Sequence, residues 1–420
     1  MLIHKNLLLS QGFLTYIYTR SFKSRNLDLK ERIKIVNDRA GIFIRQPGGY
    51  YTFVPKPLPP DPPIKYDAEL QLLLSNADRE LARLDGITTV LPNPELFVSM
   101  YVKKEALISS QIEGTQASLE GVLEFETNLK PKDNIEDLKE VVNYIKALHF
   151  GIKRQEEIPI SNRLIKELHE ILLVNTKGSN RNPGNFRKFQ NWIGPPGGTI
   201  RDAIFIPPPA NEVENCMAAL EKFIHAEDKI PTLVKCAFIH SQFETIHPFL
   251  DGNGRIGRLL ITLYLHSNNI LSYPLLYLSY FFKKYRVEYY DYLLKVRTEG
   301  EWENWIAFFL QAIIETSQNA IITARNIIDL QKSLINNLRI NKVTSPLAVI
   351  LIEKLFEHPI LNLSHIQEIL DTSRQTASDL INKFKKLGIL TEITGKERYR
   401  IYQFSDYLKI IEEGTKLNNF

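Results

Sequence analysis

The segment from His247 to Arg258 concentrates residue types that can handle a phosphorylated ligand; it reads His-Pro-Phe-Leu-Asp-Gly-Asn-Gly-Arg-Ile-Gly-Arg. Gly252, Asn253 and Gly254 stand at the start of an apolar helical run. Glycines let the backbone come close to a ligand, and the free N–H groups and the dipole at a helix start favour an anion. The pattern therefore predicts an anion site at the N-terminus of a helix.

Four side chains around this helix start supply further groups that phosphate chemistry needs. Arg255 and Arg258 are three residues apart, so both guanidinium groups can reach one side of a polyphosphate. Asp251 offers a hard oxygen ligand for Mg²⁺, which typically binds one or two carboxylates and substrate phosphates. His247, at the end of the preceding predicted helix, has an ordinary pKa suited to taking a proton from a hydroxyl near neutral pH.

Each of these features has an ordinary structural explanation when taken singly. A lone histidine is usually structural, Gly-Asn-Gly is usually a turn, and an arginine pair on a helix is usually a solvated face. Their conjunction in one short segment instead favours phosphoryl or nucleotidyl transfer, which needs a base, a metal ligand, an anion site and cationic clamps.

The same segment resembles the signature of the Fic family, H-P-F-x-(D/E)-G-N-G-R-x-x-R, at every specified position. The resemblance implies a helical core that binds ATP and Mg²⁺, transfers AMP to a Tyr, Thr or Ser hydroxyl of a protein, and releases pyrophosphate. It assigns His247 as the general base and Asp251 as the Mg²⁺ ligand. The ATP-binding run implied by the resemblance comprises Gly252, Asn253, Gly254, Arg255, Ile256, Gly257 and Arg258.

Two further regions are similar to parts of that family's site. Paired Pro and Gly residues between 189 and 206 predict a β-hairpin, which resembles the Fic flap that clamps a target segment by strand addition, with Ile204 and Phe205 at its working end. A surface hairpin that packs on the core is the alternative. Tyr289 and Tyr290 resemble the family's tyrosines near the adenine, although a structural role is an equal alternative.

A run upstream, Ser109-Ser-Gln-Ile-Glu-Gly-Thr115, is typical of a helix end with Gly114 as its stop. Taken alone, Glu113 is an ordinary surface carboxylate. The run nevertheless resembles the Fic inhibitory motif (S/T)-x-x-x-E-(G/N), with Ser109, Glu113 and Gly114 at the defining positions. That resemblance implies that Glu113 pairs with Arg258 and keeps it from the γ-phosphate of ATP, so the enzyme restrains itself.

A compact unit near the C-terminus combines three predicted helices with an alternating segment from Gly388 to Tyr402, which is typical of a winged helix. Basic residues follow its third helix and its wing: Arg374, Gln375 beside it, Lys383, Lys385, Lys386, Lys396, Arg398 and Arg400. This pattern fits phosphate contacts with DNA, whereas Asp379, Glu392 and Glu397 dilute it. DNA and a protein partner both remain open.

The expected fold is mainly α, with a Fic-type helical core, a β-hairpin flap and a C-terminal winged-helix domain. The resemblance to the family covers roughly residues 39–320. The expected divisions are an N-terminal extension (1–38), a Fic N-terminal region with the inhibitory helix (39–130), the catalytic core (131–325), a linker (326–343), the winged helix (344–405) and a C-terminal tail (406–420).

Composition places limits on the class of protein. The chain has 420 residues, of which 44% are hydrophobic, and 52 basic residues nearly cancel 48 acidic ones, so charge alone does not indicate a nucleic-acid binder. Cys216 and Cys236 form no C-x-x-C pair, which fits a reducing cytoplasm. No stretch is typical of a membrane span. We expect a protein substrate and self-modification; dimers are common in the resembling family.

Overall fold

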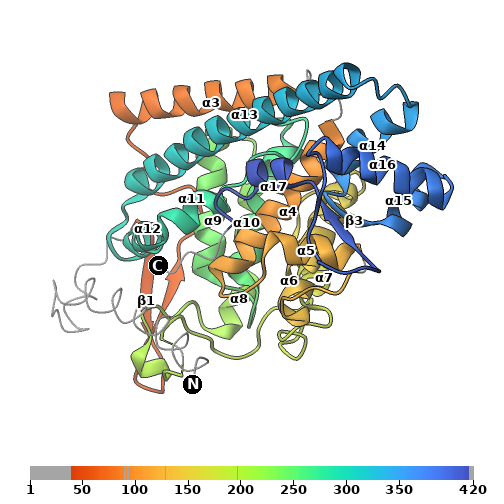
Figure 1. The fold of residues 1–420 in the computed structure, drawn as a ribbon. Coiled ribbons are helices and arrows are strands. Elements are labelled where there is room, and N and C mark those ends of the chain that lie inside the picture. Colours follow the sequence, from red (N-terminus) through yellow and green to blue (C-terminus); the bar gives the residue numbers. More distant parts are fainter. Residues whose placement is uncertain (1–38, 89–90, 92–93, 128, 196, 416–420) are drawn as a thin grey trace.

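The computed structural model describes residues 39–88, 91, 94–127, 129–195 and 197–415 (Figure 1). The expected extension at residues 1–38 lies outside the described residues. Helices dominate the described part and strands are few, so the prediction of a mainly α fold is confirmed. The helices that precede the signature are α3 (Ala68–Thr88), α4 (Pro94–Ile112), α5 (Leu119–Glu126), α6 (Ile135–Arg154), α7 (Asn162–Leu173), α8 (Val213–Ile224) and α9 (Thr232–Ile246).

Helices α9 and α10 (Asn253–Ser267) form the centre of the molecule, and the loop between them carries the signature. Every residue of α9 from Leu233 to Ile246 is buried, as is the run from Arg255 to Leu265 in α10. A helix buried on all sides belongs to the interior of a protein. The loop between these helices is therefore fixed by two core elements.

Helices α6 and α7 support this centre from one side. The apolar face of α7 places Leu164, Leu168 and Leu172 in the core. Ser161 caps α7 by accepting a hydrogen bond from the Leu164 N–H at 3.3 Å, which satisfies a donor that a helix start leaves free.

A short N-terminal hairpin lies beside the site. Strands β1 (Gly41–Arg45) and β2 (Tyr51–Pro55) pair antiparallel, with Phe43 opposite Phe53. The Phe53 N–H donates to the carbonyl of Ile206 at 2.9 Å. The hairpin thus adds its backbone to the segment predicted as the flap.

Helix α13 (Trp302–Ile340) covers most of the expected linker at residues 326–343, so this stretch is helical up to Ile340. The helix follows α11 (Ser279–Lys284) and α12 (Arg286–Glu299) and runs beside α3 (Figure 1). Its buried face continues through Leu334 and Leu338, so apolar residues at helical spacing persist within the polar stretch. Despite this length, no helix of the described residues is long and apolar enough to cross a membrane.

The C-terminal unit contains α14 (Pro346–Glu357), β3 (Ile360–Asn362), α15 (Leu363–Leu370), α16 (Arg374–Lys386), β4 (Thr391–Glu392) and β5 (Ile401–Gln403). Its sheet has the order β3-β5-β4, so a third strand joins the two that the alternation indicates. The winged helix stays a prediction for this unit. Helix α14 packs against α4, and β3 packs against α5.

The expected C-terminal tail (406–420) begins with a helix that packs on the rest of the molecule; the structure describes it as far as residue 415. Helix α17 (Ser405–Ile411) buries Tyr407, Leu408 and Ile411 and lies between α13 and α4 (Figure 1). Its apolar residues are spaced three or four apart, which gives one buried helical face.

Candidate active site

The loop between α9 and α10 is held in shape by its own side chains. Phe249 donates its N–H to Asn253 Oδ1 at 2.8 Å, and Asn253 Nδ2 donates back to the Phe249 carbonyl at 2.8 Å. The Asn253 amide is thus used on the loop backbone. Because the side-chain amide of Asn253 is bonded to the loop, its backbone N–H is the group that remains for the predicted phosphate contact.

His247 ends α9 in the left-handed region, with φ at 50°. Burial, together with the guanidinium groups of Arg297 and Arg187, lowers the pKa of His247 to about 4. Its imidazole is therefore neutral at pH 7, the form that accepts a proton. The ring Nδ1 has no hydrogen-bond partner among the described residues.

Two residues that the sequence did not single out hold the backbone of His247. Arg187 Nε donates to the His247 carbonyl at 2.9 Å, and Asn191 Nδ2 donates to the same oxygen at 3.3 Å. Arg187 also donates to the Phe189 carbonyl at 3.3 Å and to the Pro208 carbonyl at 2.6 Å, so it ties the start of the predicted flap segment and the stretch that follows it to the end of α9. Both residues stand in an irregular stretch, where no periodicity reveals a buried role.

A third residue that the sequence did not single out, His169, orients the metal-ligand candidate Asp251. The Gly184 N–H donates to His169 Nδ1 at 2.9 Å, so the proton is on Nε2, which donates to the Asp251 carbonyl at 3.0 Å. The ring stacks on Phe249 with centroids 3.7 Å apart. The sequence signal that could have revealed this role is a histidine on the apolar face of a predicted helix. Periodicity indicates that such a histidine is buried but does not identify its hydrogen-bond partner.

The start of α10 has the form of an anion site. Gly252 caps the helix with φ at 77°, a conformation that favours glycine. Arg255 is buried beside it, and its Nε and Nη1 lack hydrogen-bond partners among the described residues. Its nearest acidic contacts are Asp251 Oδ1 at 3.4 Å and Glu140 Oε2 at 3.7 Å. Buried donors without acceptors are costly, which fits a ligand that supplies oxygens.

Asp251 leaves a carboxylate partly free at this helix start. Its Oδ1 accepts from the Gly252 N–H at 2.6 Å, and its side chain remains 42% exposed. The described residues contain no cluster of three acidic, His or Cys side chains that would hold a metal alone. One carboxylate beside phosphates nevertheless suits Mg²⁺, because substrate oxygens complete its coordination.

Arg258 is engaged by the predicted inhibitory motif. Its Nη2 donates to Glu113 Oε1 at 2.6 Å, while Ser109 accepts from Nε through Oγ and from Nη2 through its carbonyl, both at 2.9 Å. Burial opposes ionisation of Glu113, but the Arg258 charge outweighs it and leaves the pKa of Glu113 below its ordinary value. Glu113 is therefore a carboxylate at pH 7 and forms a charge-assisted pair.

Glycines in α10 make room for carboxylates. A Cβ on Gly254 would come within 2.2 Å of Glu113 Oε1, so Glu113 lies directly against the helix start. A Cβ on Gly257 would come within 2.3 Å of Glu244 Oε1. Ile256, between them, is fully buried in the core. Ile256 thus fills the core with its side chain, and Gly257 leaves room for the Glu244 carboxylate because it has no side chain.

The predicted flap is corrected from a regular hairpin to a single bridge between Ile193 and Phe205. Ile193 N–H donates to the Phe205 carbonyl and Ile204 N–H to the Ile193 carbonyl, each at 2.8 Å. A longer ladder is not formed because Pro195 has no N–H to donate and a short 3₁₀ turn follows at Ile200–Asp202.

Phe205 does not face outward from this segment. It is 5% exposed and packs on Phe53, with the guanidinium of Arg297 4.1 Å from its ring centroid. Ile204 beside it is half-buried. Contact with a target through these two residues stays a prediction, and the Phe205 side chain serves the core.

The two predicted adenine-site tyrosines differ in position. Tyr289 is 1% exposed. Its O–H donates at 2.9 Å to His240 Nε2, because His240 Nδ1 donates to the Gly257 carbonyl. Tyr290 is 37% exposed and lies beside Arg286. Tyr289 thus supports α10 from within, and only Tyr290 presents a ring surface to a ligand.

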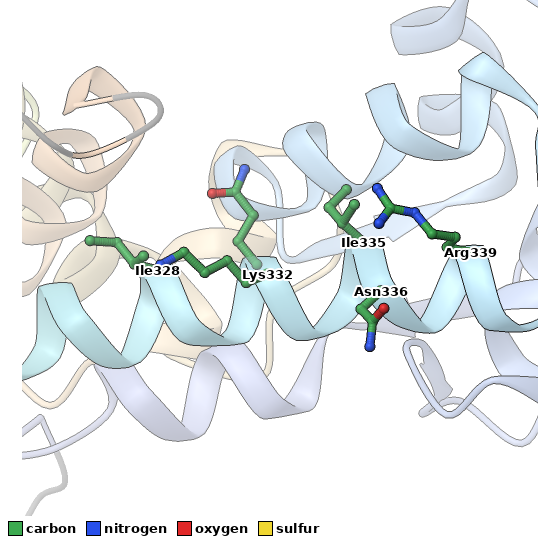
Figure 2. Close-up of a pocket in the computed structure, with 6 residues that line it drawn as sticks. Ile328, Lys332, Ile335, Asn336 and Arg339 are labelled. Carbon is green, nitrogen blue, oxygen red and sulfur yellow. The ribbon is translucent and has the colours of Figure 1, made fainter.

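A hollow of about 320 Å³ lies elsewhere, along α13. Figure 2 shows α13 side chains that line this hollow: Ile328, Lys332, Ile335, Asn336 and Arg339. None of these residues belongs to the signature segment. Beside α10, by contrast, the Glu113 carboxylate occupies the space in front of Gly254. We therefore locate the candidate site by its chemistry and not by the hollow.

Together, helices α9 and α10 place His247 one short loop ahead of a glycine-capped helix start that carries two buried arginines, Arg255 and Arg258. Residues 71–153 match the Fic/DOC family N-terminal region and residues 159–265 match the Fic/DOC family. These two segments of the chain are therefore similar to the two Fic/DOC regions.

Named relatives agree with this assignment. The chain is 32% identical over 192 residues to a probable protein adenylyltransferase of Aquifex aeolicus, which covers 45% of this chain and 54% of that protein. It is 32% identical over 128 residues to the protein adenylyltransferase Fic of Culex quinquefasciatus, covering 30% of this chain and 22% of the relative. The chain thus spans at most about half the length of these relatives.

A solved structure shows the same fold. A Fic family protein from Desulfovibrio desulfuricans superposes with a TM-score of 0.55 at 18% identity, covering 81% of this chain and 97% of that one. At this identity the likeness concerns the fold alone.

Proposed function

We propose that this chain is a protein adenylyltransferase that moves AMP from ATP onto a Tyr, Thr or Ser hydroxyl of a protein. One observation carries the proposal: the neutral, buried His247 precedes by one short loop a helix start where Arg255 has buried donors without acceptors. The curated relatives named as protein adenylyltransferases support it.

The chemistry follows from these positions. The target hydroxyl attacks the α-phosphorus of ATP while its proton passes to the His247 imidazole, which the low pKa keeps neutral. An O–P bond forms to the target, the bond to the bridging oxygen breaks, and pyrophosphate leaves. Backbone N–H groups at Gly252–Gly254 and the Arg255 guanidinium stabilise the phosphate charge.

Asp251 is the residue that would hold Mg²⁺. When bound, the ion would neutralise phosphate charge. The chain's own contribution is orientation: the His169 hydrogen bond to the Asp251 carbonyl and the Gly252 hydrogen bond to its carboxylate fix this residue at the helix start.

Autoinhibition is the second part of the proposal. Arg258 can hold either the Glu113 carboxylate or the γ-phosphate, and Glu113 lies within 2.6 Å of it. ATP that binds without Arg258 would present its α-phosphorus badly to the hydroxyl. A misplacement of about 1 Å can cost on the order of a hundredfold in rate.

Labelled ATP tests both parts. We expect Glu113→Gly to raise AMP transfer, onto the chain itself and onto lysate proteins, by on the order of a hundredfold. Adding His247→Ala to this variant should remove at least about a hundredfold of that activity. His266→Ala, which changes a histidine at the far end of α10, is the matched control and should leave labelling unchanged.

Equal labelling of Glu113→Gly and the parent chain would contradict the inhibitory role. Intact-mass analysis of the product identifies the transferred group, because a phosphate, another nucleotide or loss of AMP gives a different mass change. Any added mass other than that of AMP would overturn the adenylyltransferase assignment in favour of another Fic reaction.

A DNA-binding regulator that uses the Fic core as a nucleotide sensor is the second candidate. The observation in its favour is exposure: Lys383, Lys385 and Lys386 on α16 and Lys396 and Arg398 in the wing all face solvent. This function predicts DNA binding that survives His247→Ala, whereas AMP transfer does not survive it.

A further inference from the structure

Gln111, in the last turn of α4, connects the inhibitory motif to the C-terminal segment of the chain. It is 7% exposed and precedes Glu113 by two residues. Its Nε2 donates to the Ala117 carbonyl at 2.9 Å and to the Thr415 carbonyl at 3.0 Å. Its Oε1 accepts from Lys283 Nζ at 2.7 Å.

The chemistry of the partners fixes the orientation of this amide. A lysine ammonium only donates and a backbone carbonyl only accepts, so Lys283 must face Oε1 and the two carbonyls must face Nε2. Lys283 Nζ also lies 3.4 Å from the Gly414 carbonyl. Two side chains from different helices thus grip adjacent carbonyls of the C-terminal segment.

The C-terminal segment is shaped for this position. Gly414, with φ at 79°, lies so close to Tyr280 that an added Cβ would come within 2.2 Å of the ring. Thr415 is buried and closes a turn by donating its N–H to the Glu412 carbonyl at 2.9 Å. The segment follows α17, whose apolar face packs on α13 and α4.

The turn that carries Glu113 is built on Gln111 and its neighbour. The Glu113 N–H donates to the Ser110 carbonyl at 3.0 Å, and the Gly114 N–H donates to the Gln111 carbonyl at 3.1 Å. A shift of Gln111 therefore moves the backbone from which Glu113 reaches Arg258. The strength of the Glu113–Arg258 pair therefore depends on the position of this turn.

We propose that residues 405–415 act as a latch: by holding Gln111 they keep Glu113 on Arg258. This inference rests on the proposed function and names the part of the molecule that controls it. The latch begins at Ser405, two residues after strand β5 ends at Gln403. Phe404, which lies between them, donates its N–H to the Pro359 carbonyl at 2.8 Å. A partner that displaces β5 pulls the latch from Gln111 and releases the inhibition.

The full-length Gln111→Leu variant tests the latch, because leucine keeps the volume and removes the hydrogen bonds. We expect self-labelling with ATP to rise about three- to tenfold, the effect of one or two net hydrogen bonds on the inhibited state. In the Glu113→Gly background the same substitution should add nothing. Gln116→Leu is the matched control: Gln116 is exposed, its side-chain amide donates to the nearby Gly114 carbonyl, and the variant should label like the parent.

Gly414→Ala approaches the latch from its other side. Its Cβ collides with Tyr280, so the segment must move while Gln111 is intact, and we again expect raised labelling. Circular dichroism confirms that each variant is folded. Hydrogen exchange of residues 109–115 supplies a readout independent of activity and should rise in both variants.

The outcomes separate this inference from the proposed function. If Glu113→Gly is active but Gln111→Leu and Gly414→Ala both label like the parent, the latch is overturned. A rise in Gln116→Leu equal to that in Gln111→Leu overturns it as well, because any loosening of the turn would then suffice. If Glu113→Gly is inactive the adenylyltransferase proposal fails, and hydrogen exchange decides the latch: faster exchange supports it and unchanged exchange sinks it.

Discussion

The state of a single imidazole determines what the candidate site can do. Burial and two guanidinium groups, those of Arg297 on α12 and Arg187 in the preceding loop, keep His247 neutral. The same burial would make an ordinary polar side chain costly. Here the low pKa means that the base form is present throughout the physiological range.

This gives a prediction for the pH dependence of transfer. The base form is present above the folded pKa of about 4 and is lost only as the pH falls through that value, so the Glu113→Gly rate should be flat between pH 6 and 8. Removing Glu113 does not reverse this, because its charge raises the His247 pKa. Initial rates of labelling across this range measure it. A rate that halves near pH 6.5, the ordinary histidine value, would contradict the environment described for His247.

Among the elements, the start of α10 stands out because, in the proposed function, ATP and Glu113 compete for it. Its glycines and Arg258 suit a phosphate chain, and Glu113 from α4 lies in the same place. A carboxylate and a phosphate both satisfy a bidentate guanidinium donor. Under the proposed function, this element therefore both binds ATP and holds the carboxylate that restrains it.

Helix α13 carries the next prediction. Lys332 is exposed within the stretch that composition marks as a linker, yet the helix is continuous there. Lys332→Pro should lower the free energy of unfolding by about 3 kcal/mol, because proline removes a helical hydrogen bond and clashes with the preceding turn. Lys332→Ala, the control, should be nearly neutral. Chemical denaturation measures both variants, and a proline variant as stable as the parent would restore the linker.

At the scale of the whole molecule, the C-terminal unit packs against the helices that precede the signature. Helix α14 packs on α4, β3 packs on α5, and α17 packs on α4 and α13 (Figure 1). The C-terminal unit therefore contacts α4, the helix that ends at Ile112, next to Glu113.

DNA is the ligand to test on this unit, with the full-length chain. If α16 and the wing contact phosphates, affinity in a mobility-shift assay should fall steeply with salt, and Lys385→Ala should reduce the salt slope by about one. Lys229→Ala, which removes an exposed lysine outside the C-terminal unit, should leave the slope unchanged. Binding without salt dependence, or none at all, would favour a protein partner.

Much of the site could be predicted because it is local in the chain. His247, Asp251 and Arg255 are brought together by one loop and one helix turn, and the spacing of residues in a helix fixes which of them share a face. The end of α4 at Ile112 was likewise predictable, because Gly114 follows it as a helix stop. Residues such as His169, Arg187 and Asn191 were missed because their partners lie dozens of positions away.

The sequence by itself determined the helical fold class, the anion-binding helix start and the residue types that serve it, since backbone periodicity and short-range geometry depend only on neighbours. Only the tertiary structure decided that Phe205 turns into the core, that residues 326–340 remain helical, and that Gln111 meets Thr415. Those outcomes depend on which surfaces pack together, and packing joins segments far apart in the chain, where no short-range pattern records the partner.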